Sequence, residues 1–216
     1  MEENYYVCDN FSSSLYIKLA RAGFISTSVQ LTSKKYYLLP EIQFEYAVLE
    51  FKDLHISKKV RKIMNKNNYI FQESKNIEDI KNIINSINNY HKDSWICKEY
   101  EEMLLELFQK KSKDFKLLGF ELFDKQTKEL IAGELGYKIG NIYTSLTGFL
   151  KKEKKYNNFG KLQLVLLSKY LENSSYDFWN LGHACLEYKI DLGSKILKRD
   201  EFLEKWFKSI RNSEIH

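Results

Sequence analysis

One carboxylate stands out in this chain as a candidate for acid–base chemistry. Glu134 lies between Gly133 and Gly136, inside a segment (130–138) whose alternating apolar residues predict a strand. A carboxyl group among small residues in the middle of a sheet is an unusual placement, and it suits a group that exchanges a proton with a substrate. The alternative is a structural role in which Glu134 pairs with a buried cation.

His183 is the second candidate catalytic residue, because it follows Gly182 at the end of a predicted strand (176–181). A structural histidine at the strand end is the alternative. The chain has no Gly-x-Ser-x-Gly elbow and no phosphate-binding loop, so a covalent nucleophile is not supported. Its three cysteines are odd in number and lack metal-ligand spacing, which indicates reduced thiols and no metal site: Cys8, Cys97 and Cys185.

Two clusters of basic residues could bind phosphate groups. The first crowds a helix predicted to begin after Ser57, with no acidic residue among its members: Lys58, Lys59, Arg61 and Lys62. The second precedes a Gly-containing turn that opens another helix, where backbone N–H groups attract anions: Lys151, Lys152, Lys154 and Lys155. With a net charge of +5, each cluster could equally be a solvated surface.

The elements that position these residues read as an α+β domain. Three predicted strands joined by two tight turns (124–128 and 139–141) form a meander over 117–149, suited to the middle of an antiparallel sheet. We predict that residues 1–50 form a small N-terminal subdomain or an extension of that sheet, and that residues 51–216 form the main domain. A later helix is predicted to take Ser94 as its N-cap.

No run of apolar residues is long enough for a membrane span, and the acidic, polar N-terminus does not resemble a signal peptide. We therefore expect a cytoplasmic protein that does not enter a membrane, and we expect it to be a monomer.

The order of three strands, a basic Gly turn, a helix and a strand resembles the GNAT-like acetyltransferases. Their coenzyme A signature is not matched by the KYNNFG segment at 155–160, so a coenzyme A-dependent acetyltransferase is not favoured.

A closer resemblance is to the leucyl/phenylalanyl-tRNA–protein transferases, whose domain is GNAT-like and whose donor is aminoacyl-tRNA. SWICKE at 94–99 is similar to the family's Thr-Trp-Ile-x-x-Glu. Further similar segments, in the same order along the chain, are VLEFKDLHISKKVRK (48–62), AGELGY (132–137), IYTSLTGF (142–149) and FWNLGH (178–183). The resemblance covers most of residues 45–207.

The sequence departs from the bacterial members at two motifs. Leu146 stands where their Gly-Glu-Ser-Met-Phe segment carries its glutamate, and His183 falls near the glutamine of their Asp-Cys-Gln segment. These motifs concern donor and acceptor recognition. Two alternatives to leucyl or phenylalanyl transfer therefore stay open: arginyl transfer to acidic N-termini, and a non-catalytic tRNA- or RNA-binding module.

The resemblance implies an enzyme that moves an amino acid from charged tRNA to the N-terminal α-amine of an acceptor protein in an N-degron pathway, without a cofactor. Glu134 would orient or deprotonate the amine, with His183 on the proton path or at the terminal ribose. Trp95 would stack on the terminal adenine or an acceptor residue. The remaining predicted substrate-binding residues are Glu99, Tyr143, Ser145, Thr147 and Phe149, and the two basic clusters would grip tRNA phosphates.

Overall fold

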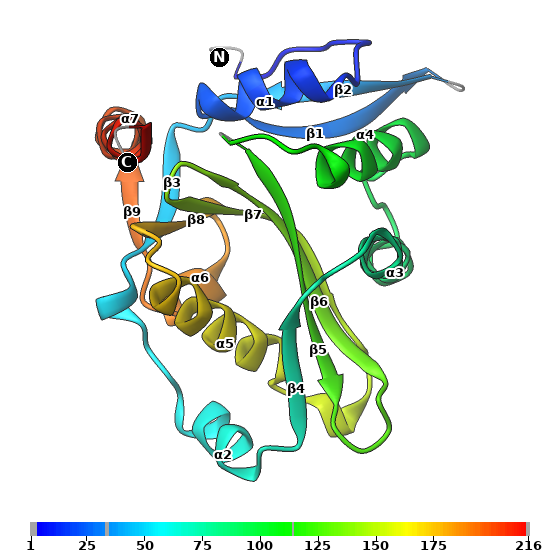
Figure 1. Cartoon of the computed structure of the whole chain (residues 1–216), viewed down its shortest axis with the longest axis vertical. Coiled ribbons are helices and arrows are strands. Elements are labelled where there is room, and N and C mark those ends of the chain that lie inside the picture. The colour runs from blue at the N-terminus through cyan, green and yellow to red at the C-terminus, as the bar shows by residue number, and fades with distance from the viewer. Residues whose placement is uncertain (1–3, 33–34, 114, 215–216) are drawn as a thin grey trace.

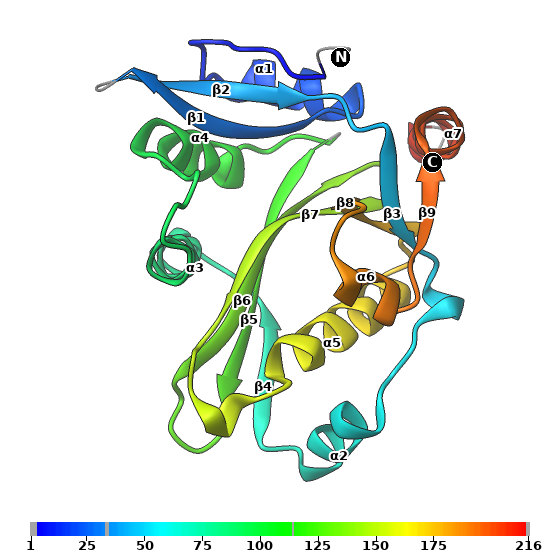
Figure 2. The ribbon, with the colours of Figure 1, turned by 180° about the vertical axis from the view of Figure 1, so that it is seen from behind.

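A seven-stranded mixed sheet forms the centre of the computed structural model, which describes residues 4–32, 35–113 and 115–214. All neighbouring strands are antiparallel except the parallel pair β7–β8. In spatial order the strands are β4 (Tyr69–Glu73), β5 (Lys116–Asp124), β6 (Leu130–Ile139), β7 (Ile142–Leu150), β8 (Phe178–His183), β3 (Glu45–Leu49) and β9 (Lys195–Lys198). The predicted α+β, GNAT-like fold is confirmed (Figures 1 and 2).

The predicted meander is present as β5, β6 and β7. The first turn is held by Asp124, whose carboxylate accepts hydrogen bonds from the backbone N–H groups of Gln126 and Thr127 at 2.9 and 3.0 Å. The second reversal contains Gly140, whose φ of 55° favours glycine. Short local turns thus place β6, the strand of Glu134, between two antiparallel neighbours.

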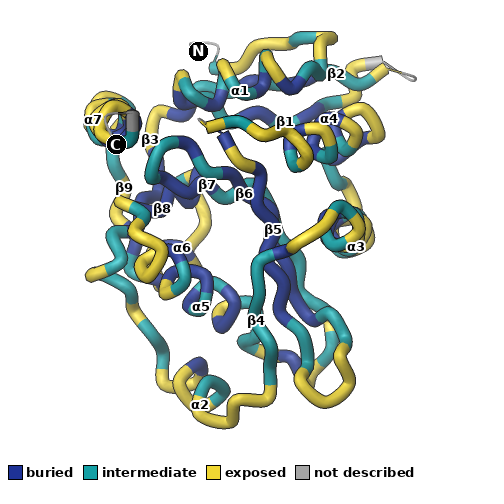
Figure 3. The backbone as a smooth tube through the Cα atoms, viewed as in Figure 1, coloured by how far each residue is buried: buried dark blue, intermediate teal, exposed yellow. Residues whose placement is uncertain are grey.

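Helices cover both faces of the sheet (Figure 1). Each face has its own buried apolar cluster, and the central strands β5 and β6 consist largely of buried residues (Figure 3). On one face lie α2 (Lys58–Lys66), α5 (Phe159–Asn173) and the short α6 (Glu187–Asp191). On the other lie α3 (Ile77–Tyr90), α4 (Lys98–Gln109) and α7 (Arg199–Glu214). Two single turns of 3-10 helix connect elements at Phe51–Asp53 and Lys154–Tyr156.

The first fifty residues divide between two sheets. After α1 (Ser13–Arg21), β1 (Ile25–Thr32) and β2 (Lys35–Glu41) form an antiparallel two-stranded sheet of their own, and this small N-terminal sheet was expected. The next strand, β3, inserts into the large sheet between β8 and β9. A domain boundary at residue 50 stays a prediction.

Helix capping follows the sequence at one predicted start and departs from it at another. Ser57 caps α2, and its hydroxyl accepts a hydrogen bond from the Val60 N–H at 3.3 Å. The predicted N-cap at Ser94 is wrong, because α4 begins after Cys97. The Ser94 hydroxyl instead donates to the Asn88 side chain at 2.5 Å, so it ties the end of α3 to the segment before α4.

Candidate active site

Glu134 occupies the middle of β6 on the face covered by α5, and it is only 6% exposed. Two side chains of the neighbouring strand donate hydrogen bonds to one of its carboxylate oxygens. The Ser145 hydroxyl lies 2.5 Å from Oε1, and the Tyr143 hydroxyl lies 3.3 Å from it. The structure therefore brings together three residues that the sequence had singled out separately.

The two glycines beside Glu134 make room for aromatic rings. A Cβ atom on Gly136 would lie 2.2 Å from the Tyr143 hydroxyl oxygen, so only glycine lets that ring cross β6 to reach the carboxylate. A Cβ atom on Gly133 would lie 2.6 Å from the Phe149 ring, on the opposite face of the sheet. The small residues around Glu134 thus have a packing reason.

A second hydrogen bond fixes Ser145 from the parallel strand. Trp179 of β8 is fully buried, and its Nε1–H donates to the Ser145 hydroxyl at 2.8 Å. Because Ser145 accepts from the indole, its own proton is directed to Glu134. A chain of hydrogen bonds runs from β8 through β7 to β6, and it ends on the buried carboxylate.

Burial raises the pKa of Glu134 to about 7, against the opposing influence of the Ser145 and Tyr143 hydrogen bonds and of Lys189. A carboxyl group that titrates near neutral pH can both accept and return a proton under physiological conditions. This property is what acid–base catalysis requires of the residue.

Parallel pairing of β7 with β8 ends just before Ser145. The last paired residues are Thr144 and Asn180, and among the described strands none continues along this side of β7 towards Leu150. Ser145 is half-buried there. The acid–base network consequently reaches the surface at the point where the two strands part.

A β-bulge in β7 decides which predicted residues join Glu134. Leu135 of β6 pairs with Thr147, but the next residue, Gly136, pairs with Ser145, so Leu146 has no partner of its own in β6. Residues directly opposite one another in an antiparallel pair share a face, and one extra residue reverses the alternation beyond it.

The bulge separates the predicted substrate-binding residues into two groups. Tyr143 and Ser145 lie on the α5 face with Glu134. Thr147 and Phe149 lie on the opposite face, where Phe149 packs against the apolar cluster that α3 and α4 share. These two residues are therefore not part of the hydrogen-bonded network around Glu134.

Three other predicted residues also lie away from the network. Trp95 is half-buried against the α3–α4 cluster, with its ring edge-to-face with Tyr100 at 4.8 Å. Glu99 is exposed in the first turn of α4. The His183 side chain is 50% exposed, and its Nε2 lies 3.5 Å from the carboxylate of Glu41 in β2. The structure thus directs His183 towards the N-terminal hairpin.

Two residues that lacked an assigned role in the sequence belong to the site: Trp179 and Lys189. Lys189 of α6 is 4% exposed, and its ammonium group donates to the backbone carbonyl of His183. Trp179 falls in the FWNLGH segment of family resemblance, and Lys189 follows that segment by six residues, within the range of the resemblance. That signal could have found them, but their contacts depend on the tertiary structure.

A cavity of about 210 Å³ lies between α2, α5 and α6, beside the start of the basic helix. Its wall includes Ser57 at the start of α2, Val165 of α5 and Tyr188 of α6. Burial, and then the nearby Glu134 carboxylate, raises the pKa of Tyr188. One side chain that lines the cavity is therefore also influenced by the charge of the buried acid.

The first basic cluster presents its charges to solvent. Lys58, Lys59, Arg61 and Lys62 are all exposed on α2, while Val60 faces the core. Within the described ranges no carboxylate lies within ion-pair distance of these four residues, although Arg61 Nε donates to the Ile56 carbonyl at 3.1 Å. Their positive charge is available to a phosphate backbone.

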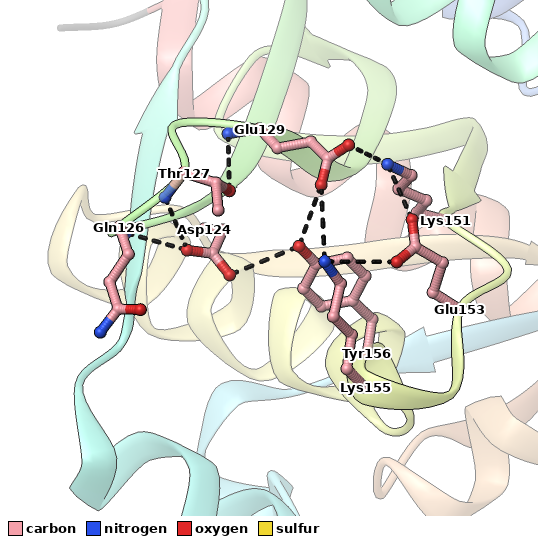
Figure 4. Close-up of polar contacts among 8 residues, drawn as sticks. All are labelled: Asp124, Gln126, Thr127, Glu129, Lys151, Glu153, Lys155 and Tyr156. Atoms are coloured by element: carbon pink, nitrogen blue, oxygen red, sulfur yellow. Dashed lines mark hydrogen bonds and ion pairs between the residues drawn. The ribbon is translucent and has the colours of Figure 1, made fainter.

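The second basic cluster is largely engaged in an ion-pair network (Figure 4). Lys151 contacts the carboxylates of both Glu129 and Glu153. Lys155 lies 3.3 Å from Glu153 and 3.9 Å from Glu129, and the Tyr156 hydroxyl donates to Glu129 at 3.1 Å. Two lysine charges are therefore balanced by two carboxylates.

The other two lysines of this cluster differ from each other. The Lys152 ammonium group donates to the Tyr90 backbone carbonyl at 3.2 Å and lies over the Tyr90 ring, whereas Lys154 is exposed. The predicted anion site at the start of α5 thus has fewer available cations than the sequence suggested.

No group of three or more His, Cys, Asp or Glu side chains that could hold a metal ion occurs among the described residues. None of the helices in those ranges is long and apolar enough to cross a membrane.

Solved structures with the same fold have little sequence in common with this chain. FemX matches with a TM-score of 0.53 at 10% identity, over 89% of this chain and 68% of FemX. The C-terminal domain of a putative lysylphosphatidylglycerol synthetase from Agrobacterium fabrum gives 0.52 at 10% identity, over 87% of this chain and 64% of its own. L-PGS from Bacillus licheniformis matches with a TM-score of 0.49 at 13% identity, over 77% of this chain and 64% of L-PGS.

This chain accordingly spans about 64% of the length of the latter two proteins. At this level of identity the FemX and Agrobacterium fabrum matches establish a shared fold and nothing further. No curated protein matches the sequence.

A family model described as leucyl/phenylalanyl-tRNA protein transferase matches residues 48–206. This range contains Glu134, Ser145, Trp179 and the basic helix α2. The matched family is one of aminoacyl-tRNA-dependent transferases, and the chain shares its fold with FemX. The chain belongs to the leucyl/phenylalanyl-tRNA protein transferase family.

Proposed function

We propose that this protein transfers an amino acid, leucine or phenylalanine, from charged tRNA to the N-terminal α-amine of an acceptor protein. The observation that carries the proposal is the buried Glu134 carboxylate with its Ser145 and Trp179 hydrogen-bond chain, inside the range that matches the family. The same proposal makes the protein a cytoplasmic monomer of an N-degron pathway that works without a cofactor.

The reaction needs proton transfer and positioning more than covalent help. The acceptor amine attacks the ester carbonyl carbon of the aminoacyl-tRNA, an amide bond forms, and the ester C–O bond to the ribose breaks. The proton lost by the amine passes through Ser145 or a water to Glu134, and it returns to the leaving ribose oxygen. The pKa of Glu134, about 7, suits both directions of this transfer.

The tRNA is bound through its phosphates by α2. Lys58, Lys59, Arg61 and Lys62 neutralise acceptor-stem phosphates without reading sequence, so binding weakens steeply as salt rises. The cavity between α2, α5 and α6 lies beside this helix, and Tyr188 lines it. The exposed Lys154 adds a smaller contribution.

The predicted residues outside the Glu134 network keep the substrate-binding roles that the family resemblance implies. Trp95 stacks on the terminal adenine or on an acceptor residue, and Phe149 lines the donor side-chain pocket. Thr147 and Glu99 contact the substrates. His183 hydrogen-bonds the terminal ribose or shares the proton path, and its present partner is Glu41.

A second candidate function is a non-catalytic RNA-binding module. The observation that favours it is the set of exposed cations on α2 that have no carboxylate partner among the described residues, because they would bind RNA whether or not the Glu134 network is active. Arginyl transfer to acidic N-termini by the same chemistry is the remaining enzymatic variant.

A transfer assay tests the proposal directly. Total tRNA is charged separately with labelled leucine, phenylalanine or arginine, and each is offered peptides beginning with Arg, Lys, Asp or Glu. We expect leucine or phenylalanine to reach the basic N-termini. Glu134→Gln should reduce transfer by about a hundredfold or more, since general acid–base groups contribute 10²–10⁴.

The control is Glu121→Gln, because Glu121 is also buried in the sheet, on β5, but lies outside the Ser145 network. Transfer that survives Glu134→Gln unchanged would remove the acid from the mechanism. Salt-sensitive tRNA binding without transfer from any charged tRNA would refute the transferase and support the RNA-binding module.

A further inference from the structure

The edge of β7 that faces β8 has a neighbouring strand along only three of its nine residues. β8 pairs with residues 142–144, and no described strand lies beside residues 145–150 on that side. The other edge of β7 is paired with β6 as far as Leu150. Figure 2 shows β7 continuing past β8 towards the start of α5. A central strand of the sheet therefore has an open edge over 145–150.

The hydrogen bonds between β6 and β7 show which backbone groups point out of this edge. The Lys151 N–H donates to the Ile131 carbonyl of β6 at 2.7 Å. Bonded and non-bonded residue pairs alternate along an antiparallel ladder. Phe149 therefore also bonds to β6, whereas the N–H and C=O groups of Gly148 and Leu150 point away from it.

A side chain at the end of α3 agrees with that direction. His91 follows the last residue of α3, and its Nε2 lies 3.0 Å from the Gly148 carbonyl oxygen, to which it donates. The side chain of His91 is exposed, so it can turn into solvent without leaving a cavity behind. The Gly148 carbonyl can therefore exchange His91 for another donor.

The open segment lacks two features that commonly protect a strand edge. Charged side chains and proline deter other chains from adding to an exposed edge. Residues 145–150, SLTGFL, contain neither, and each of them is half-buried. A bulge is a further protective feature, but the bulge in β7 lies at Leu146, before the outward groups of Gly148 and Leu150. These groups suit pairing with an extended chain.

The reacting groups determine where such a chain begins. Ser145 stands at the start of the open edge, and its hydroxyl donates to the Glu134 carboxylate at 2.5 Å. An acceptor whose α-amine loses its proton at Ser145 extends from there towards Leu150, in the direction of β7. This is also the direction of β8, which is parallel to β7. Alternating donors and acceptors match a peptide, whereas the phosphates of a nucleic acid only accept.

We propose that the N-terminal segment of the acceptor protein adds to β7 as a parallel strand over residues 145–150, with its α-amine at Ser145. Its backbone bonds to Gly148 and Leu150, and the contact of His91 with Gly148 is released. At about 3.3 Å per residue, the edge takes up about five residues of the acceptor. The position of the amine rests on the proposed function, but strand addition is measured without any transfer.

Amide hydrogen exchange, followed by NMR, measures the docking. A six-residue peptide that begins with Arg is added to the full chain, with and without uncharged tRNA. We expect exchange of the Gly148 and Leu150 amides to slow by about tenfold or more at saturating peptide. The Phe149 amide, which already bonds to β6, is the control within the strand. The outer edge of β4, at one end of the sheet, is the control for other exposed strands.

Backbone N-methylation of the peptide tests the strand geometry in the transfer assay. Every second residue of an added strand points its N–H at β7, so methyl groups placed singly on residues 2 to 5 should act in alternation. We expect kcat/KM to fall by about tenfold or more at alternate positions and by less than about twofold between them. Equal losses at all four positions, or none, would overturn the proposal.

Removing His91 tests the exchange of partners at Gly148. In His91→Ala the carbonyl has lost its competing donor, so KM for the peptide should fall by about two- to fivefold while kcat stays the same. Asn89→Ala is the matched control, because Asn89 is exposed near the same helix end. A KM that rises in His91→Ala would contradict the release of His91.

The outcomes separate this proposal from the proposed function. Unchanged exchange at Gly148 and Leu150 with a peptide that does receive an amino acid would overturn strand addition and retain the transferase. Slowed exchange with a peptide that receives none would refute the transferase and retain the docking edge. Protection of both amides without peptide, in a chain that sediments as a dimer, would overturn the proposal and assign the edge to a second copy of this chain.

Discussion

The two basic clusters of this protein look alike in sequence and differ in structure. On α2, Lys58 to Lys62 contain four cations that face solvent without a carboxylate partner in the described chain. Between β7 and α5, Lys151 and Lys155 are held by Glu129 and Glu153 (Figure 4). A cation already paired with a carboxylate has little charge left to offer a phosphate.

This difference between the clusters indicates which of them would release counterions from bound tRNA. Neutralising phosphates with unpaired cations displaces the ions condensed on RNA, and this release gives binding its salt dependence. A paired lysine must first give up its carboxylate, so its net gain is small. We therefore expect α2 to dominate tRNA affinity, and the loop at 151–155 to contribute little to it.

The largest change in tRNA affinity should come from removing the positive charges of α2. With Lys58, Lys59, Arg61 and Lys62 all changed to Gln, we expect tRNA affinity near physiological salt to fall by about 10- to 100-fold. The slope of log affinity against log salt should decrease by about three to four, close to one per lost contact. Filter binding or fluorescence anisotropy over a salt series measures both quantities.

The matched control removes four exposed lysines from other surfaces: Lys18, Lys75, Lys111 and Lys113 changed to Gln. This variant has the same net charge as the α2 variant. An equal loss of affinity in the two proteins would mean that total charge, and not α2, binds the tRNA.

Freeing the paired lysines should increase tRNA affinity, and this change should be smaller than the loss in the α2 variant. Changing Glu129 and Glu153 to Gln removes the partners of Lys151 and Lys155, so tRNA should bind about two- to fivefold more tightly with a steeper salt slope. The same anisotropy titration detects it. Unchanged affinity would show that this loop does not contact the tRNA, and would narrow the footprint to α2.

The smallest effect is expected for the paired lysines themselves. Lys151→Gln with Lys155→Gln should weaken tRNA binding by less than about threefold, because their charges are already neutralised. Thermal unfolding should change little, since exposed ion pairs contribute little to stability. A loss as large as that of the α2 variant would break the distinction between the clusters.

Much of the framework could be predicted from the sequence because its causes are local. Alternating apolar residues predicted β5, β6 and β7, and Gly140 marked the reversal between the last two. Ser57 signalled the start of α2. The family resemblance, carried by short motifs, pointed to the range that the family model matches.

The arrangement of side chains in the site depends on how neighbouring strands pair, which local sequence patterns do not encode. The bulge at Leu146 arises from the register between β6 and β7, and it sends Thr147 and Phe149 to one face and leaves Ser145 on the other. Alternation within one strand carries no information about such a register, so the sequence assigned all three residues to substrate binding without separating them.

By itself the sequence determined the elements, the isolated carboxylate of Glu134 and the presence of two lysine clusters. Only the tertiary structure decided that Glu134 meets Ser145 and Trp179, that Lys189 is buried, and that one lysine cluster is neutralised. The physical reason is that propensity and periodicity act between near neighbours in the chain. Burial and charge pairing depend instead on segments that only the folded sheet brings together.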